Sequence, residues 1–389
     1  MTKGRGRSNV SKPADPAQGS VSDFCILNGR VDARLSDVER LTLLGGSGLD
    51  RLLQRLGKSL NSVTLDAFAP GLEIDALRSQ HEKLLELRAA GALASLFVDQ
   101  RTETTPTIVP IHGFPVGGVY DLGFHSTFPA AEWAHDKEYN TLVQNQTSYV
   151  RLWEHSDKLD ERKTIIAIHG WTMGDQRVNS LAFLPGLFFS LGFNVAIVEL
   201  PFHGRRRPDS VDEHAPLFPS ADPIRTCVAM AHAVHDLRTL SRFLVSRGHG
   251  RLCCMGMSLG AYVGLLWASL DPIERGVFMV PLVSMGDMAW ELVRLKHKEE
   301  RDIPRGMTKT LLRDLFADHY PLARKPATAE GSILVVGGRG DHLVPKNQIA
   351  LLRERWPQAT ITWASGGHAA PAQSGECFET VRSFLVKEG

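Results

Sequence analysis

From about residue 164 onward, short runs of apolar and β-branched residues alternate with longer segments of helical periodicity. This alternation is typical of β-α-β units, in which parallel strands form a sheet with helices on both faces. The runs are almost continuously apolar, as strands covered on both faces require. They predict six strands, at residues 164–168, 194–199, 251–255, 276–280, 332–336 and 360–363. The chain is therefore expected to adopt an α/β fold.

The part of the chain before this alternation has a different organisation. Residues 118–128 and 147–154 predict two further strands, which we expect to form an antiparallel edge of the same sheet, for a total of about eight strands. Residues 31–56 and 72–98 have helical patterns with charged, solvated faces. We thus expect a disordered basic tail at 1–20, a helical extension at 21–117 and the sheet domain at 118–389. The sheet domain or a second copy of the chain would cover the apolar faces of the extension.

The charge balance excludes two classes of protein. Lys plus Arg number 44, Asp plus Glu number 43, and 43% of the residues are hydrophobic. A disordered chain needs low hydrophobicity and a large net charge, and a nucleic-acid-binding protein needs clustered excess cations. We therefore expect a globular protein without a nucleic-acid partner.

The cysteines and the N-terminus favour a cytoplasmic protein that holds no metal. The five cysteines form no Cys-x-x-Cys pair and no metal-ligand spacing with histidine, which suits free thiols in a reducing compartment. The basic N-terminal residues are not followed by the apolar segment of a secretory signal. The most apolar stretch, residues 183–202, is interrupted by Pro185 and Pro201, so we expect no transmembrane segment.

Three segments that each follow a predicted strand carry the candidate chemistry. The first, residues 256–260, has the pattern Gly-x-Ser-x-Gly, and a helical segment rich in small residues follows it. A serine on a sharp strand-to-helix turn is exposed for attack, and the flanking glycines avoid collisions with the neighbouring chain. The positive end of the following helix would stabilise the negative charge that develops on the reacting oxygens. Ser258 is therefore the candidate nucleophile.

The other two segments supply a candidate acid and a candidate base. Asp341 follows the strand at 332–336 through a glycine turn, and His368 follows the strand at 360–363 through two glycines. Open α/β sheets place their sites at the carboxyl ends of the strands, where these residues would meet Ser258. A serine hydroxyl needs a base to remove its proton, and the base needs a third group to orient it. The three residues thus predict acyl transfer through an acyl-enzyme that water resolves.

With its motifs in this order, the region 118–389 resembles the α/β-hydrolase fold of the serine-hydrolase superfamily. A further segment, His169-Gly170-Trp171, resembles the His-Gly-x turn after the third strand of that fold. The resemblance implies an oxyanion hole formed by the backbone N–H groups of Trp171 and Leu259. It also implies an enzyme similar to esterases and lipases, acting on a small-molecule ester or a lipid-like substrate.

A shorter resemblance concerns a group of α/β hydrolases with long N-terminal extensions. Residues 173–175, 199–209 and 280–284 are similar to that group, whose best-known branch is linked to mitochondrial cardiolipin deacylation. The segment around Trp171 departs from the pattern of the group. A phospholipid substrate is one expectation that this resemblance adds.

Several further residues carry alternative interpretations. Asp287, after the strand at 276–280, is the alternative triad acid, because some members of the superfamily carry the acid there. Arginines beside the site can hold a carboxylate or phosphate, although the same residues can simply form the turn after a strand. The candidates for substrate binding are His169, His203, Arg205 and Arg206.

Two other segments are assigned by their patterns. A second His-Gly pair, at residues 112–113, is predicted to lie in a loop before the first strand, because residues 103–110 contain two prolines. Residues 288–328 are predicted to form a helical insertion after the sixth strand. This insertion would either cap the nucleophile or pack on the sheet.

These observations predict an intracellular serine hydrolase with a Ser-His-Asp triad and with neither a metal nor an organic cofactor. Two alternatives come from other classes. An acyltransferase on the same fold would pass the acyl group to an alcohol or amine, and a non-catalytic scaffold would bind a partner through residues 21–105. The extension would also supply the interface of a homo-oligomer.

Overall fold

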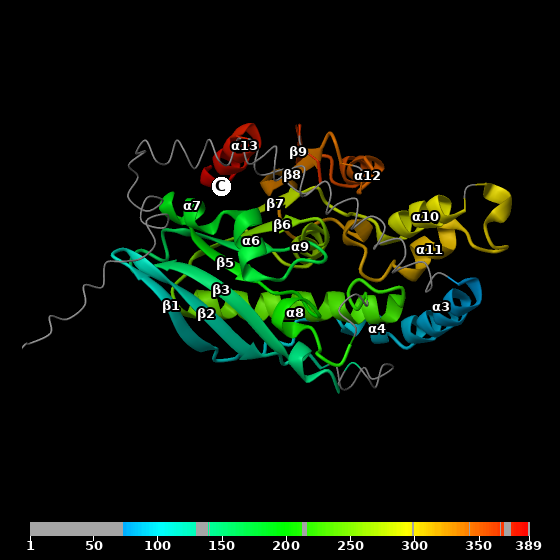
Figure 1. Cartoon of the computed structure of the whole chain (residues 1–389), viewed down its shortest axis with the longest axis horizontal. Coiled ribbons are helices and arrows are strands. Elements are labelled where there is room, and N and C mark those ends of the chain that lie inside the picture. Colours follow the sequence, from blue (N-terminus) through cyan, green and yellow to red (C-terminus); the bar gives the residue numbers. More distant parts are fainter. Residues whose placement is uncertain are drawn as a thin grey trace, which may run out of the picture.

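The computed structural model describes residues 73–129, 139, 141–211, 216–297, 299–341, 343–365, 367–368 and 375–387. The predicted tail at 1–20 and the predicted helix at 31–56 lie outside the described residues. Within the described part, a central sheet is flanked by helices on both faces (Figure 1). None of the helices in this part is both long and apolar enough to cross a membrane.

The described residues form a sheet of nine strands in the order β1-β2-β3-β5-β4-β6-β7-β8-β9. Strands β4 to β9 run parallel, and β1, β2 and β3 are joined to them as an antiparallel edge. The prediction of a mostly parallel sheet with an antiparallel edge is confirmed. The strands are β1 (Thr107–Phe114), β2 (Gly117–His125), β3 (Thr147–His155), β4 (Lys163–Ile168), β5 (Asn194–Val198), β6 (Arg251–Met257), β7 (Arg275–Met279), β8 (Ile333–Gly338) and β9 (Thr360–Ala364).

Strand β1 is absent from the predicted elements. His112 and Gly113, which were predicted to lie in a loop, belong to this strand, so that prediction was wrong. The strand pairs only with β2, and its register shifts between Pro110 and His112. A proline lacks the N–H that a central strand would need, whereas an edge strand tolerates it. The sheet therefore begins at Thr107, before the expected start of the domain at residue 118.

The core lies in two clusters, one on each face of the sheet. Alternate residues of a strand point to opposite faces, so Ile166 of β4 joins the cluster that includes α8 and α9, and Ile165 joins the one that includes α7 and α13. Asp222 caps α8 by accepting hydrogen bonds from two backbone N–H groups. The helices around the sheet are α6 (Gln176–Phe183), α7 (Pro185–Ser190), α8 (Pro223–Ser246), α9 (Leu259–Leu270), α12 (Asn347–Arg355) and α13 (Gly375–Val386).

The helices before the sheet contact the insertion between β7 and β8. The predicted helix at 72–98 is present as α3 (Ile74–Ala89) and α4 (Ala92–Ser95), separated by Gly91 in the left-handed conformation. In the insertion, α10 (Met285–Lys296) and α11 (Lys309–Leu315) pack on each other, and α3 contacts α11 (Figure 1). Single 3₁₀ turns lie at Val143–Gln146, Gly204–Arg206, Glu300–Asp302, Pro321–Ala323 and Glu330–Ser332.

Candidate active site

Ser258 lies on the turn between β6 and α9. Its backbone has φ 55° and ψ −113°, a conformation that residues with a side chain rarely adopt, so the turn is strained. Its N–H donates to the carbonyl of Met279 in β7 (3.0 Å), which ties the turn to the sheet. A β-carbon at Gly260 would collide with the carbonyl oxygens of Ile168 and His169. The Gly-x-Ser-x-Gly pattern thus provides the close approach that such a turn needs.

A chain of hydrogen bonds connects Ser258 with His368 and Asp341. The Nε2 atom of His368 lies 2.9 Å from Ser258 Oγ, and its Nδ1 atom lies 2.8 Å from a carboxylate oxygen of Asp341. Because a carboxylate only accepts, Nδ1 carries the proton and Nε2 is left to accept the hydroxyl proton of Ser258. The other oxygen of Asp341 accepts hydrogen bonds from the backbone N–H groups of Leu343 and Val344. The three side chains follow the carboxyl ends of β6, β8 and β9.

Asp287 lies in a separate cluster at the start of α10. Its side chain is only 3% exposed and is paired with Lys309 (2.7 Å) and Arg313 (2.8 Å). Ser284 Oγ also donates to its carboxylate (2.6 Å). Burial favours a raised pKa for Asp287, but the hydrogen bonds from Arg313, Lys309 and Ser284 keep the pKa below its usual value. The structure brings Asp341, and not Asp287, into contact with His368.

The two residues predicted to form an oxyanion hole lie beside Ser258. Leu259 is the first residue of α9, and Trp171 follows β4. Both line the same pocket as Ser258. Gly170 runs so close that a β-carbon there would lie 3.5 Å from that of Ser258. The segment after β4 therefore passes directly in front of the serine.

His169 and His203 are buried and bonded to the backbone. The Nδ1–H of His169 donates to the Gly170 carbonyl (2.8 Å), and its Nε2 accepts from the N–H of Leu200 (3.1 Å). His203 Nδ1–H donates to the carbonyl of Pro201 (2.8 Å). Burial lowers the pKa of His169 to about 4 and that of His203 to about 3. Neither is among the described residues that line the pocket, so the structure gives both a role in fixing the loops after β4 and β5.

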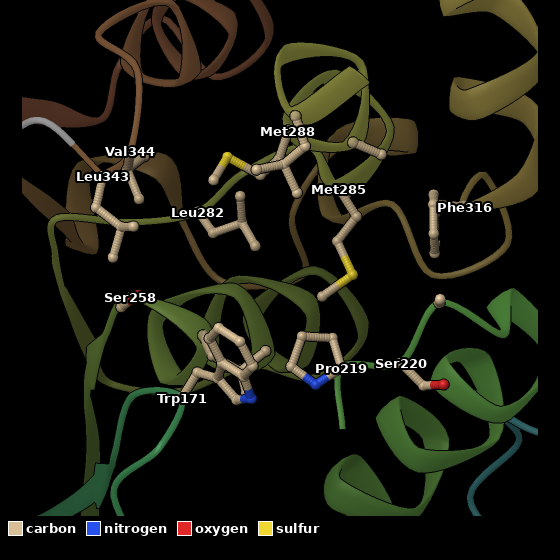
Figure 2. Close-up of a pocket in the computed structure, with 14 residues that line it drawn as sticks. Trp171, Pro219, Ser220, Ser258, Leu282, Met285, Met288, Phe316, Leu343 and Val344 are labelled. Atoms are coloured by element: carbon tan, nitrogen blue, oxygen red, sulfur yellow. The ribbon is translucent and has the colours of Figure 1, made fainter. Parts of the chain in front are cut away.

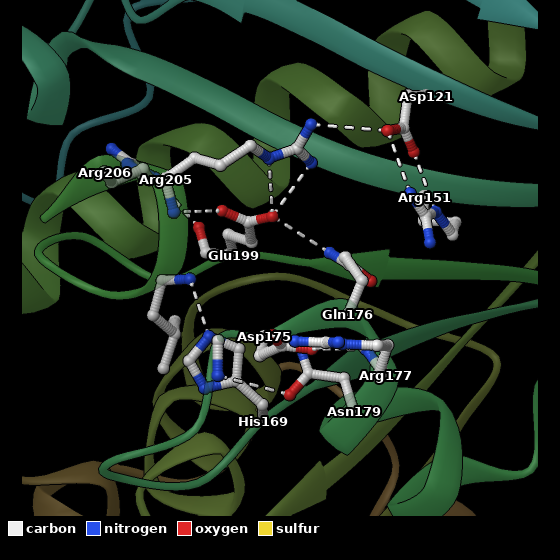
Figure 3. A network of polar contacts seen from close by, with 12 residues as sticks. Asp121, Arg151, His169, Asp175, Gln176, Arg177, Asn179, Glu199, Arg205 and Arg206 are labelled. Carbon is white, nitrogen blue, oxygen red and sulfur yellow. Dashed lines mark hydrogen bonds and ion pairs between the residues drawn. The ribbon is translucent and has the colours of Figure 1, made fainter.

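Arg205 and Arg206 are engaged by acidic and backbone groups, and neither lines the pocket; Figure 3 shows the contacts of Arg205 with Glu199 and Asp121. Arg205 pairs with Glu199 (2.8 Å) and Asp121 (3.3 Å). Arg206 is 1% exposed and pairs with Asp236 (2.8 Å), while it donates to the carbonyls of Asn145 and Glu199. The structure thus does not bring either arginine to Ser258; their contacts hold the turn after β5 against the sheet.

An apolar pocket of about 100 Å³ opens beside Ser258. Trp171 and Leu343 flank the serine, and Met285 lies between it and Phe316 in Figure 2. The insertion contributes Met285, Met288, Leu292 and Phe316 to the lining, and the chain before α8 contributes Pro219. Met288, Leu292 and Phe316 fall within the predicted insertion at 288–328, whereas Met285 and Pro219 lie outside it and were not predicted. The rule that sites lie beyond the carboxyl ends of strands would have pointed to Leu282 and Met285 after β7.

The described residues include no group of three or more His, Cys, Asp or Glu side chains that could hold a metal ion.

Comparisons with known proteins found similar folds but no similar sequence. No family model and no curated protein sequence matches the chain. The structure is similar to an acetyl xylan esterase from Paenibacillus sp. R4, with a TM-score of 0.51 and 13% identity, over 78% of this chain and 94% of that one. It is also similar to a putative hydrolase from Agrobacterium vitis S4 (TM-score 0.43, 14% identity, 73% and 98% covered) and to an esterase from Pyrococcus furiosus (0.40, 17%, 74% and 94%). The chain therefore has the α/β-hydrolase fold.

Proposed function

We propose that this protein is a serine hydrolase that cleaves a carboxylic ester or thioester. The observation that carries the proposal is the continuous hydrogen-bonded chain from Asp341 through His368 to Ser258. A hydroxyl in this setting has its base in place, and the base has its orienting carboxylate. The serine also stands on a strained turn at the entrance of an apolar pocket.

In the proposed reaction, Ser258 Oγ attacks the acyl carbonyl while His368 Nε2 takes its proton. The backbone N–H groups of Trp171 and Leu259 would receive the developing oxyanion, to which the N-terminus of α9 adds its positive potential. His368 then gives the proton to the leaving oxygen or sulfur, which departs and leaves an acyl-enzyme. A water molecule, activated by the same imidazole, releases the acid. Asp341 fixes the imidazole and stabilises its charged form.

The insertion has a place in this proposal. Met288, Leu292 and Phe316 line the pocket, so we propose that residues 288–328 act as a cap over the acyl site of the hydrolase domain, which begins with β1 at Thr107 and not at the expected residue 118. The burial of Leu312 and Leu315 in the core shows that the same segment packs on the body of the protein. A cap built in this way shapes the pocket without being a separate domain.

The test is the substitution Ser258→Ala in the full chain. We expect p-nitrophenyl acetate turnover to fall by about 10⁴-fold or more, because the nucleophile is lost. A fluorophosphonate probe should label the unchanged protein at Ser258 and leave the variant unlabelled. The matched control is Ser269→Ala on the same helix, whose hydroxyl bonds to the carbonyl of Leu266 far along α9. Product analysis with added alcohol separates hydrolysis from transfer to an alcohol.

Two results would contradict the proposal. One is a folded protein that neither turns over any short ester nor reacts with the probe. The other is a Ser258→Ala variant that keeps the activity of the Ser269→Ala control. The first result would favour a binding role for the same pocket, and the second would mean that groups other than Ser258 carry out the reaction.

A further inference from the structure

Two neighbouring cavities share part of their lining. The first is the apolar pocket of about 100 Å³ beside Ser258, and the second, of about 440 Å³, lies between α10, α11 and α12. Met285 and Phe316 line both cavities. The rest of the second cavity combines polar residues, among them Asp287 and Arg313, with apolar surface. Two side chains thus form a wall between a small apolar pocket and a larger cavity of mixed polarity.

Contacts between α10 and α11 hold this wall in place. Met285 is the first residue of α10 and Phe316 directly follows α11; they are 6% and 8% exposed. The Asp287 carboxylate pairs with Arg313 and so joins the first turn of α10 to α11. Gly286 packs so closely that a β-carbon there would lie 2.5 Å from the Cα of Arg313. The spacing of the two helices, and with it the position of both wall residues, is therefore fixed.

The location of the pocket relative to the proposed triad indicates which arm of an ester enters it. The leaving oxygen must lie within hydrogen-bond reach of His368 Nε2, because His368 returns the proton to it. Trp171 and Leu259, which carry the proposed oxyanion hole, line the pocket together with Leu343 and Val344 beside Asp341, whereas His368 is not among its described lining residues. On this ground the acyl arm is assigned to the pocket and the alcohol arm to the side of His368.

We propose that Met285 and Phe316 set the upper limit on acyl-chain length in the proposed ester hydrolysis, on which this inference rests. An apolar cavity of about 150 Å³ holds one benzene molecule. The pocket of about 100 Å³ accepts a shorter, aliphatic acyl group, with about four carbon atoms beyond the carbonyl. A longer chain meets the wall and cannot reach the second cavity.

The experiment compares p-nitrophenyl esters from acetate to decanoate in the full chain. In the unchanged protein we expect kcat/KM to fall beyond the length that the pocket holds. Met285→Ala and Phe316→Ala each join the two cavities. The decanoate-to-butanoate ratio of kcat/KM should then rise about tenfold or more, because each methylene group that finds apolar surface contributes at most about fourfold. The control Leu351→Ala, which lines the second cavity alone, should leave the ratio unchanged.

A converse variant tests the pocket from within. Ala289 lies on α10 and lines the apolar pocket but not the second cavity. Ala289→Leu should shorten the accepted chain and lower the butanoate-to-acetate ratio. This variant decides the proposal if both wall variants fail to fold, as judged by circular dichroism and thermal unfolding.

The outcomes are separable. Folded, active wall variants with an unchanged ratio would overturn the proposal, and so would an Ala289→Leu variant with an unchanged ratio. Chain-length dependence in the alcohol of acetate esters, with none in the acyl group, would overturn the assignment of the acyl arm. Inactivity of the unchanged protein on every ester would instead contradict the proposed function. The unchanged protein is therefore assayed before any variant.

Discussion

Four fully buried histidines make the stability of this protein depend on pH. Burial is the largest cause in each case, and it lowers the pKa because the charged imidazole loses its hydration. The values are about 4 for His169 and His319, and about 3 for His203 and His232. In the folded protein these side chains therefore stay neutral well below the ordinary histidine pKa of 6.5.

We expect the free energy of unfolding to fall as the pH falls from about 6.5 towards 4. In this window the unfolded chain binds a proton at each of these histidines and the folded protein does not, so protonation favours unfolding. The slope is about 1.4 kcal/mol per pH unit for each histidine. Carboxylates with lowered pKa contribute only closer to pH 4, so the range from pH 6.5 to 5 reports the histidines. Urea unfolding at a series of pH values measures the slope.

The variant His319→Gln should lower this slope by about 1.4 kcal/mol per pH unit, which is the contribution of one proton. The exposed His112 on β1 supplies the control, since His112→Gln should leave the slope unchanged. Equal slopes in all three proteins would mean that the buried imidazoles do not control acid unfolding.

At the residue scale, the sequence predicted what depends on local patterns. Ser258, Asp341 and His368 could each be named because each directly follows a strand with a glycine turn. The contacts of Arg205 and Arg206 could not be predicted, because their partners Asp121 and Asp236 come from β2 and α8, far away in the sequence. Three adjacent arginines do not reveal which carboxylates the fold will bring to them.

At the scale of elements, helix α3 is joined to the insertion by several polar contacts, and Arg88 makes the largest number of them. Arg88 donates to both oxygens of Asp318 and to the carboxylate of Asp314, at distances from 2.7 to 3.0 Å. These carboxylates come directly after or within α11, next to the wall residue Phe316. The pKa of Arg88 is raised by its hydrogen bonds to Asp318 and Asp314, although burial opposes the shift.

Arg88→Ala should lower the free energy of unfolding by about 2 kcal/mol, because two partly buried carboxylates lose their common cation. Arg88→Lys should recover only part of this loss, since an ammonium cannot donate to both carboxylates as a planar fork does. Arg78 on the same helix is the control: its pair with Asp75 is 3.8 Å long, and both this pair and its hydrogen bond to the carbonyl of Arg305 are exposed, so Arg78→Ala should change stability by less than about 0.5 kcal/mol. Equal losses in the Arg88 and Arg78 variants, measured by urea unfolding, would contradict this account.

The elements themselves were predictable to different degrees. The buried parallel strands were found because their apolar runs are continuous. Strand β1 was missed because seven of its eight residues are exposed and it contains Pro110. The wall was not predictable, because an apolar residue of an amphipathic helix has the same pattern whether it lines a cavity or fills the core.

At the scale of the whole molecule, the helices before the sheet share its core. Leu77 and Leu84 of α3 are completely buried in the same cluster as Leu312 of α11 and Val228 of α8. The sequence predicted an extension that needs a cover, but not where it would pack, because an apolar helix face is compatible with many partners. In the described residues α3 packs on α11 of the insertion and on α8.

This packing means that deletion of residues 1–98 should prevent stable folding. The deletion exposes the surface that five buried leucines cover, and each contributes about 2 kcal/mol, a total comparable with the whole stability of a domain. The leucines are Leu77, Leu84, Leu87, Leu93 and Leu96. We expect the shortened protein to be insoluble or to lack a cooperative thermal transition.

Deletion of residues 1–20, which contain few apolar side chains, is the control and should leave the transition unchanged. A soluble 99–389 protein with the transition temperature of the full chain would show that α3 and α4 are an independent unit, and the acyl-length profile of that protein would then reveal whether α3 is needed to hold the wall.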